Sequence, residues 1–173
     1  MTNGTPSPSR EPICKIAYEE SIRGLQIQDA TLDSIRRGAT TLGSLGGLAA
    51  TFLGKEVFSK AHPMDNVGSV IDLLVIVAIA FLSVSLLTIV MLYRPRNGWI
   101  FYSSATSILD QFAGPLRTIP VDVTYDKLAR FNEINQSKND KNLKQMFWLL
   151  RFLIACVVVQ ITAWLVALAL LRR

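Results

Sequence analysis

Apolar residues gather in three stretches of the chain, with polar segments between them. Residues 67–93 contain one charged side chain, Asp72, and residues 152–171 contain none. Residues 38–54 are also uncharged, but they are shorter and rich in Gly and Thr. Because a helix needs about 20 apolar residues to span a bilayer, the first two stretches predict membrane spans. We expect residues 38–54 to form a third span, with a re-entrant or interfacial helix as the alternative.

The polar segments predict helical extensions of these spans. In residues 12–37 and just beyond, apolar side chains recur at steps of 3, 4 or 7, which predicts an amphipathic helix; they are Ile22, Leu25, Leu32, Ile35, Ala39 and Leu42. The tail, residues 1–11, is rich in Pro, Ser and Thr, so we expect it to be disordered. The expected organisation is this tail, the amphipathic helix, a transmembrane hairpin over 38–93, a cytoplasmic helical region over 94–151 and a third transmembrane helix over 152–173.

This pattern defines the expected fold class. It is all-α, an integral membrane helical bundle with about three transmembrane helices and cytoplasmic helical extensions. With the N-terminus inside, 14 of the 18 Lys and Arg residues fall on the inner side, in accord with the positive-inside rule. The modest net charge of +5 suits basic residues that flank a membrane better than it suits a nucleic-acid polymer. Cys14 and Cys156 lie in a polar and an apolar segment, so we expect both to be reduced.

An asparagine-rich stretch precedes the last span. Its register alternates steps of 3 and 4, which predicts a heptad seam; the four asparagines are Asn132, Asn135, Asn139 and Asn142, and the flanking positions are Tyr125, Leu128, Met146, Leu149, Leu153, Cys156 and Gln160. We call this row the asparagine seam. Each polar group buried without a partner costs about 1–3 kcal/mol, so we expect this face to be wet or to bind something. A solvated stalk, a polar vestibule or ligand pocket, and a surface for a partner protein are the alternatives.

Small residues follow each other at four-residue spacing in the span over 38–54. Such rows let helix backbones approach closely, within one protomer or between protomers. One row contains Ala39, Gly43, Gly47 and Thr51, and the other contains Gly46, Ala50 and Gly54.

Two polar residues inside the predicted spans are candidates for a membrane path. An acid within a span suggests a function, although Asp72 lies close enough to the end of its span to reach the headgroup region. Gln160 lies in mid-span, where a hydrogen bond to a neighbouring helix is the alternative to a path.

The sequence contains no convincing catalytic constellation. His62 is the only histidine, which excludes a histidine-based metal cluster within one chain. HExxH, CxxC and P-loop patterns are lacking, and the acids are scattered over helix surfaces. We therefore expect neither an enzyme nor a bound cofactor.

The plan of the chain resembles a group of small bacterial membrane proteins. The charged helix that continues into a small-residue span, "SIRGLQIQDATLDSIRRGATTLGSLGGLAATFLG", is followed by a second span, "YRPRNGW", a polar stretch and a final span. This order is similar to that of membrane effectors of nucleotide-signalled anti-phage systems, of the Pycsar membrane-effector and SLATT type. The resemblance implies a location in the bacterial inner membrane and membrane disruption after a cyclic-nucleotide or partner signal.

Two functions follow as hypotheses. The first is an oligomeric inner-membrane effector or pore that permeabilises or depolarises the membrane in response to a cytoplasmic ligand or partner. The second is a non-conducting adaptor that anchors a soluble partner protein. The expected partners are the lipid bilayer, further copies of the chain, and a nucleotide second messenger or a soluble protein.

Overall fold

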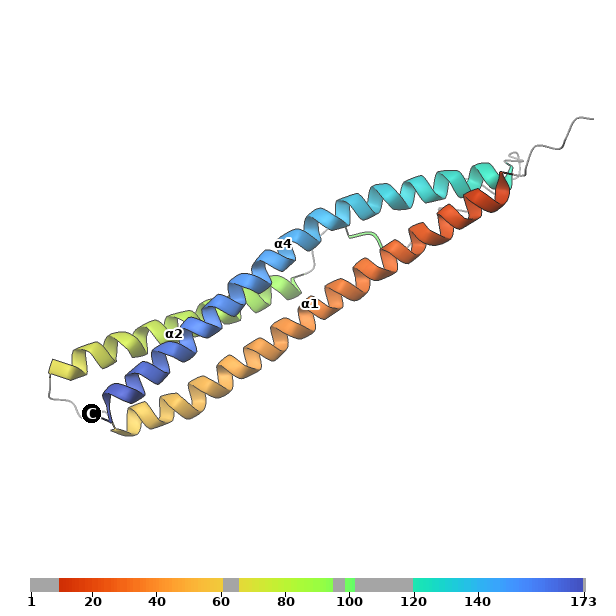
Figure 1. Ribbon diagram of the computed structural model, residues 1–173. Coiled ribbons are helices and arrows are strands. Elements are labelled where there is room, and N and C mark those ends of the chain that lie inside the picture. Colours follow the sequence, from red (N-terminus) through yellow and green to blue (C-terminus); the bar gives the residue numbers. More distant parts are fainter. Residues whose placement is uncertain (1–9, 61–65, 95–98, 102–119, 173) are drawn as a thin grey trace, which may run out of the picture. The chain divides into compact units, whose positions relative to one another are not determined.

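The computed structural model describes residues 10–60, 66–94, 99–101 and 120–172. These residues form three helices and no strand: α1 (Glu11–Lys60), α2 (Asn66–Tyr93) and α4 (Val121–Leu170) (Figure 1). The all-α fold class is therefore confirmed over the described part of the chain. The predicted tail lies mostly outside that part.

The chain divides into two units. Unit 1 comprises residues 1–31 and 96–143, and unit 2 comprises residues 32–95 and 144–173. Both α1 and α4 are uninterrupted helices of 50 residues, and each contributes to both units. Their continuity follows from the sequence, because neither contains an interior proline after the first turn of α1.

Unit 2 is a bundle of three helices. α1 and α4 run parallel here, since Gly46 accepts a hydrogen bond from Gln160 and Gly54 lies against Trp164 further along both helices. α2 runs in the opposite direction. The core contains small and large apolar residues from all three helices: Val57, Ile71, Ala78, Ala163, Trp164 and Ala167.

In unit 1, α1 and α4 form a parallel pair. The rings of Tyr18 and Tyr125 lie 5.5 Å apart near the start of both helices, and Gln28 contacts Asp140 about four turns of α4 further on. The buried positions of α1 recur at alternating steps of 3 and 4, as those of a heptad do; in unit 1 they include Ser21, Leu25 and Gln28.

Two of the described helices are long and apolar enough to cross a membrane. They are α2, over Val70–Tyr93, and α4 through its C-terminal part. Only 22% of the most apolar window of α2 is buried, and 39% of that of α4. Residues 38–54 do not meet the same criterion, because Gly, Thr and Ser lower the mean hydropathy of α1. The third span therefore stays a prediction.

Candidate functional site: a polar contact between α1 and α4

The asparagine seam forms the buried face of α4 in unit 1. Asn132, Asn135 and Asn139 are each at most 1% exposed, while Asn142 is half-buried. The amide of Asn132 donates to the Oγ of Ser21 on α1 at 2.9 Å. In turn, the Ser21 hydroxyl donates to the Tyr18 carbonyl at 2.7 Å. The first asparagine of the seam is thus joined to α1 by a short chain of hydrogen bonds.

Asn139 binds a backbone segment rather than α1. Its Nδ2 donates to the carbonyl of Ile100 at 3.0 Å, and its Oδ1 accepts from the Ile100 amide at 3.3 Å. A side-chain amide presents one donor and one acceptor, so it can satisfy both polar groups of one residue. Asn139 thereby fixes residues 99–101 against α4.

Two glutamines complete the contact between the helices. Gln28 Nε2 donates to the Gln136 carbonyl at 3.0 Å and to the Asp140 carboxylate at 2.6 Å. Gln136 Nε2 donates to the Ser21 carbonyl at 2.7 Å. Among the described residues, Gln28 Oε1 and Asn135 Nδ2 have no hydrogen-bond partner. The contact is therefore polar and not fully satisfied within unit 1.

The partners on α1 could have been found from the sequence. Ser21 and Gln28 are seven residues apart and lie in heptad register with Leu25 and Leu32. The apolar members of that register alone predict an amphipathic helix, and they give no indication of a polar partner. Water, a ligand or a partner protein was therefore expected for the asparagines, but not polar side chains on α1.

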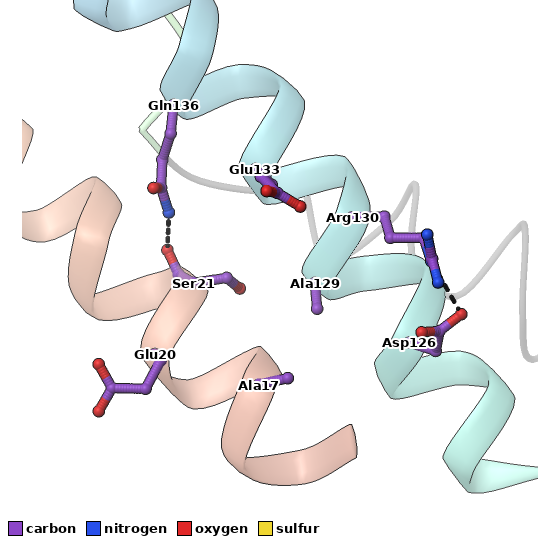
Figure 2. A pocket seen from close by; sticks show the side chains of 8 residues that line it. All are labelled: Ala17, Glu20, Ser21, Asp126, Ala129, Arg130, Glu133 and Gln136. Carbon is purple, nitrogen blue, oxygen red and sulfur yellow. Dashed lines mark hydrogen bonds and ion pairs between the residues drawn. The ribbon is translucent and has the colours of Figure 1, made fainter. Parts of the chain in front are cut away.

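A groove with a volume of about 450 Å³ lies beside this contact (Figure 2). Its lining consists of Ala17, Glu20, Ser21, Asp126, Ala129, Arg130, Glu133 and Gln136. Arg130 donates to Asp126 at 3.1 Å. This hydrogen bond and the charge of Asp126 raise the pKa of Arg130. Glu20 is also paired, with Arg23 at 3.6 Å, which leaves Glu133 as the third carboxylate of the lining. The groove therefore favours a cationic or neutral occupant over an anion.

The two candidates for a membrane path do not lie together. Asp72 is exposed near the start of α2. Gln160 is fully buried and donates to the Gly46 carbonyl at 2.9 Å, while its Oε1 has no partner among the described residues. The structure therefore joins Gln160 to α1 and leaves Asp72 on the surface.

Most of the small residues of α1 contact neighbouring helices of unit 2. Gly46 faces Gln160 and Val157, Gly54 faces Trp164, and Gly43 faces Ile89 of α2. Ala39 is fully buried, Ala50 is half-buried and Thr51 is exposed. A Cβ at Gly47 would meet nothing within 4 Å. The row that contains Gly46 and Gly54 thus packs within the protomer, and Gly47 lies on an uncovered face.

No cluster of three or more metal-ligating side chains occurs in the described part of the chain. Comparison with known protein families, curated proteins and solved structures found no match. The candidate site is therefore interpreted from its geometry alone.

Proposed function

We propose that the chain is a three-span inner-membrane effector that permeabilises or depolarises the membrane, as an oligomer, in response to a cytoplasmic partner. The observation that carries the proposal is the polar contact of unit 1, whose two helices continue without a break into the apolar bundle of unit 2. In this proposal the polar contact receives the signal and the bundle acts on the bilayer. The resemblance to nucleotide-signalled effectors supports a role in anti-phage defence.

The surface of unit 2 supports insertion into a bilayer. Large apolar side chains are exposed along α2 and α4, where they would contact water in a soluble protein; among them are Leu73, Ile76, Val90, Val158 and Leu165, all at least 51% exposed. A buried helix of a soluble core would not show this exposure.

The packing of α1 against α2 supports the third span. At one end, Tyr93 contacts the hydroxyl of Thr40 at 2.7 Å and donates to the Arg36 carbonyl at 3.2 Å. At the other end, Val57 and Ile71 share the core. The segment from Arg36 to Val57 rises about 32 Å, close to the roughly 30 Å hydrocarbon thickness of a bilayer. If α2 spans the membrane, this part of α1 lies at the same depth.

The hydroxyl groups of this segment are compatible with lipid. Thr41, Ser44 and Thr51 are exposed, and each donates to the carbonyl four residues earlier, at 3.1, 3.0 and 2.9 Å. A hydroxyl that is satisfied within its own helix needs no water. The low hydropathy of residues 38–54 therefore does not exclude a span.

The charges of unit 2 support the proposed orientation. Five basic residues occur in, or directly after, the parts of α1, α2 and α4 nearest Tyr93, against one acid, Asp33; they are Arg36, Arg37, Arg94, Lys144 and Arg151. This end of unit 2 would face the cytoplasm, together with the N-terminus.

The contact in unit 1 is suited to opening. Each hydrogen bond contributes only about 0.5–1.5 kcal/mol net, because water replaces it when the helices separate. An apolar core of the same length would resist separation more strongly. A partner that binds the separated helices could therefore shift the equilibrium toward the open form.

The groove favours a protein over a nucleotide as the signal. A nucleotide would bring its phosphates close to Glu20, Asp126 and Glu133, while Arg130 is already paired with Asp126 and Arg23 with Glu20. A basic or polar segment of a partner protein complements these carboxylates.

The adaptor function is the second candidate. It is favoured by apolar side chains on unit 1 that are 47–68% exposed among the described residues and could bind a soluble protein; they are Ile13, Ile16, Ile27, Phe131 and Ile134. In this alternative, unit 2 is only an anchor.

Two like charges introduced across the contact would distinguish the effector function from the adaptor function. The variant S21D/N132D places two carboxylates where a 2.9 Å hydrogen bond now joins α1 and α4, so repulsion should open unit 1 without any ligand. If opening shifts by 1.4 kcal/mol or more, dye release from vesicles that contain the purified protein should rise about tenfold or more. S21D/N132K is the control, because it replaces repulsion by attraction.

An equal release from the wild type, the repelling variant and the control would refute the effector proposal and favour the adaptor. The opening itself is checked by hydrogen exchange, which should accelerate in unit 1 of the repelling variant only.

A further inference from the structure

Basic and aromatic side chains form a cluster on one face of α4. Lys144, Phe147, Trp148 and Arg151 follow at steps of 3, 1 and 3, so they share a face over two turns. These four residues line an open surface groove of about 350 Å³. We call them the basic–aromatic cluster.

The two aromatic side chains are unusually exposed. Phe147 is 43% exposed and Trp148 is 69% exposed. The guanidinium carbon of Arg151 lies 5.8 Å from the centre of the Trp148 ring. A guanidinium stacked on an aromatic ring keeps its N–H groups free at its edge, where they can donate to an anion. The cluster thus offers an apolar surface and charged donors side by side.

The cluster lies at the basic end of unit 2. A side chain at Gly38 would lie 4.0 Å from Leu150, the neighbour of Arg151. Two residues to either side of Gly38, Arg36 and Thr40 contact Tyr93 at the C-terminus of α2. These contacts place the cluster level with the end of the proposed spans, where Trp and Tyr belong at a membrane surface.

The basic–aromatic cluster contains two cations and no acidic residue. No Asp or Glu follows Asp140 in the chain. Asp140 itself, one turn before Lys144, accepts a hydrogen bond from Gln28 at 2.6 Å. The two cations of the cluster therefore favour an anionic ligand.

We propose that the basic–aromatic cluster binds the headgroup of an anionic phospholipid. Lys144 and Arg151 donate to the phosphate, and Phe147 and Trp148 contact the glycerol and the upper part of the acyl chains. The exposed aromatic rings favour a lipid over a free anion, because a soluble phosphate would leave them in water. The inference rests on the membrane insertion in the proposed function and adds a ligand that this function does not require.

Native mass spectrometry of the full chain in mild detergent tests the proposal. Phosphatidylglycerol and phosphatidylcholine are added in equal amounts, and the retained lipid is counted. The wild type should retain phosphatidylglycerol preferentially, and K144Q/R151Q should bind it about 30-fold more weakly. R151K keeps the charge but loses the planar stacked group, so its affinity should lie between the two. K127Q/K138Q changes the net charge equally in unit 1 and should retain the lipid as the wild type does.

Three results would overturn the proposal. A wild type without preference, or an equal loss in both double variants, excludes a specific lipid site. Displacement of phosphatidylglycerol by millimolar inorganic phosphate would show a site for soluble anions. In a parallel experiment, vesicles of phosphatidylcholine alone are floated after alkaline extraction. If the chain floats with these vesicles but shows no lipid preference in the mass spectra, the lipid site is refuted and membrane insertion is supported. If the chain does not float, both the lipid site and membrane insertion are refuted.

Discussion

The replacement of Gln160 by methionine tests whether this buried amide is structural or lines a path. Gln160 is fully buried in unit 2, and its one described hydrogen bond goes to the Gly46 carbonyl at 2.9 Å. Its Oε1 has no partner in the described part of the chain. Gln160→Met keeps the length of the side chain and nearly its volume, so packing should change little.

Two terms decide the effect on stability. Loss of the hydrogen bond costs about 0.6 kcal/mol on average and up to about 1.7 kcal/mol between membrane helices. Removal of an unsatisfied buried acceptor recovers about 1–3 kcal/mol. The Gly46 carbonyl remains bonded within α1, since it is an interior position of that helix. We therefore expect Q160M to be as stable as the wild type or more stable by about 1 kcal/mol.

Unfolding of the full chain in mixed micelles, titrated with a denaturing detergent and followed by circular dichroism, measures this difference. A loss of more than about 2 kcal/mol would refute the reasoning, because it would mean that Oε1 has a strong partner. Dye release from vesicles gives the second readout. A changed release at unchanged stability would assign Gln160 to a path rather than to packing.

The remaining predictions concern both units. Ser21→Ala removes one hydrogen bond between α1 and Asn132, worth about 0.5–1.5 kcal/mol net. Hydrogen exchange in unit 1 should therefore accelerate about 2-fold to 12-fold while unit 2 is unchanged, and equal rates would contradict this. Gly54→Val should destabilise unit 2 by about 1–3 kcal/mol, because the new Cβ would lie 3.3 Å from Trp164. Gly47→Ala, whose new Cβ would meet nothing within 4 Å, should not lower the melting temperature, and a lower oligomer size in native mass spectrometry would assign that face to contacts between copies.

These predictions separate the two units experimentally. Ser21→Ala acts on a polar contact, whereas Gly54→Val and Gln160→Met act on the apolar bundle. If the helices transmit a signal between the units, the variant with the faster exchange in unit 1 should also alter dye release. If unit 2 is only an anchor, the two readouts should be independent.

Much of the fold could be predicted from the sequence. Local periodicity and the lack of interior helix breakers predict the helices. The alternating steps of 3 and 4 predict that the residues of the seam from Leu128 to Gln160 share one face of a helix. The structure buries its members Leu128, Asn132, Asn135, Asn139, Met146, Leu153, Cys156 and Gln160. Periodicity determines which residues share a face, and this property belongs to a single helix.

What that face contacts was decided only by the tertiary structure. The asparagines were expected to need water, a ligand or a partner protein, but Ser21 and Ile100 supply hydrogen bonds from within the chain. Likewise, residues 38–54 are too polar for hydropathy alone to identify a span, yet they lie alongside α2. The physical reason is the same in both cases. Hydropathy and spacing are properties of one segment of the chain. The cost of a buried amide depends on which neighbour supplies its hydrogen-bond partner, and the cost of a glycine depends on which neighbouring side chain packs against it.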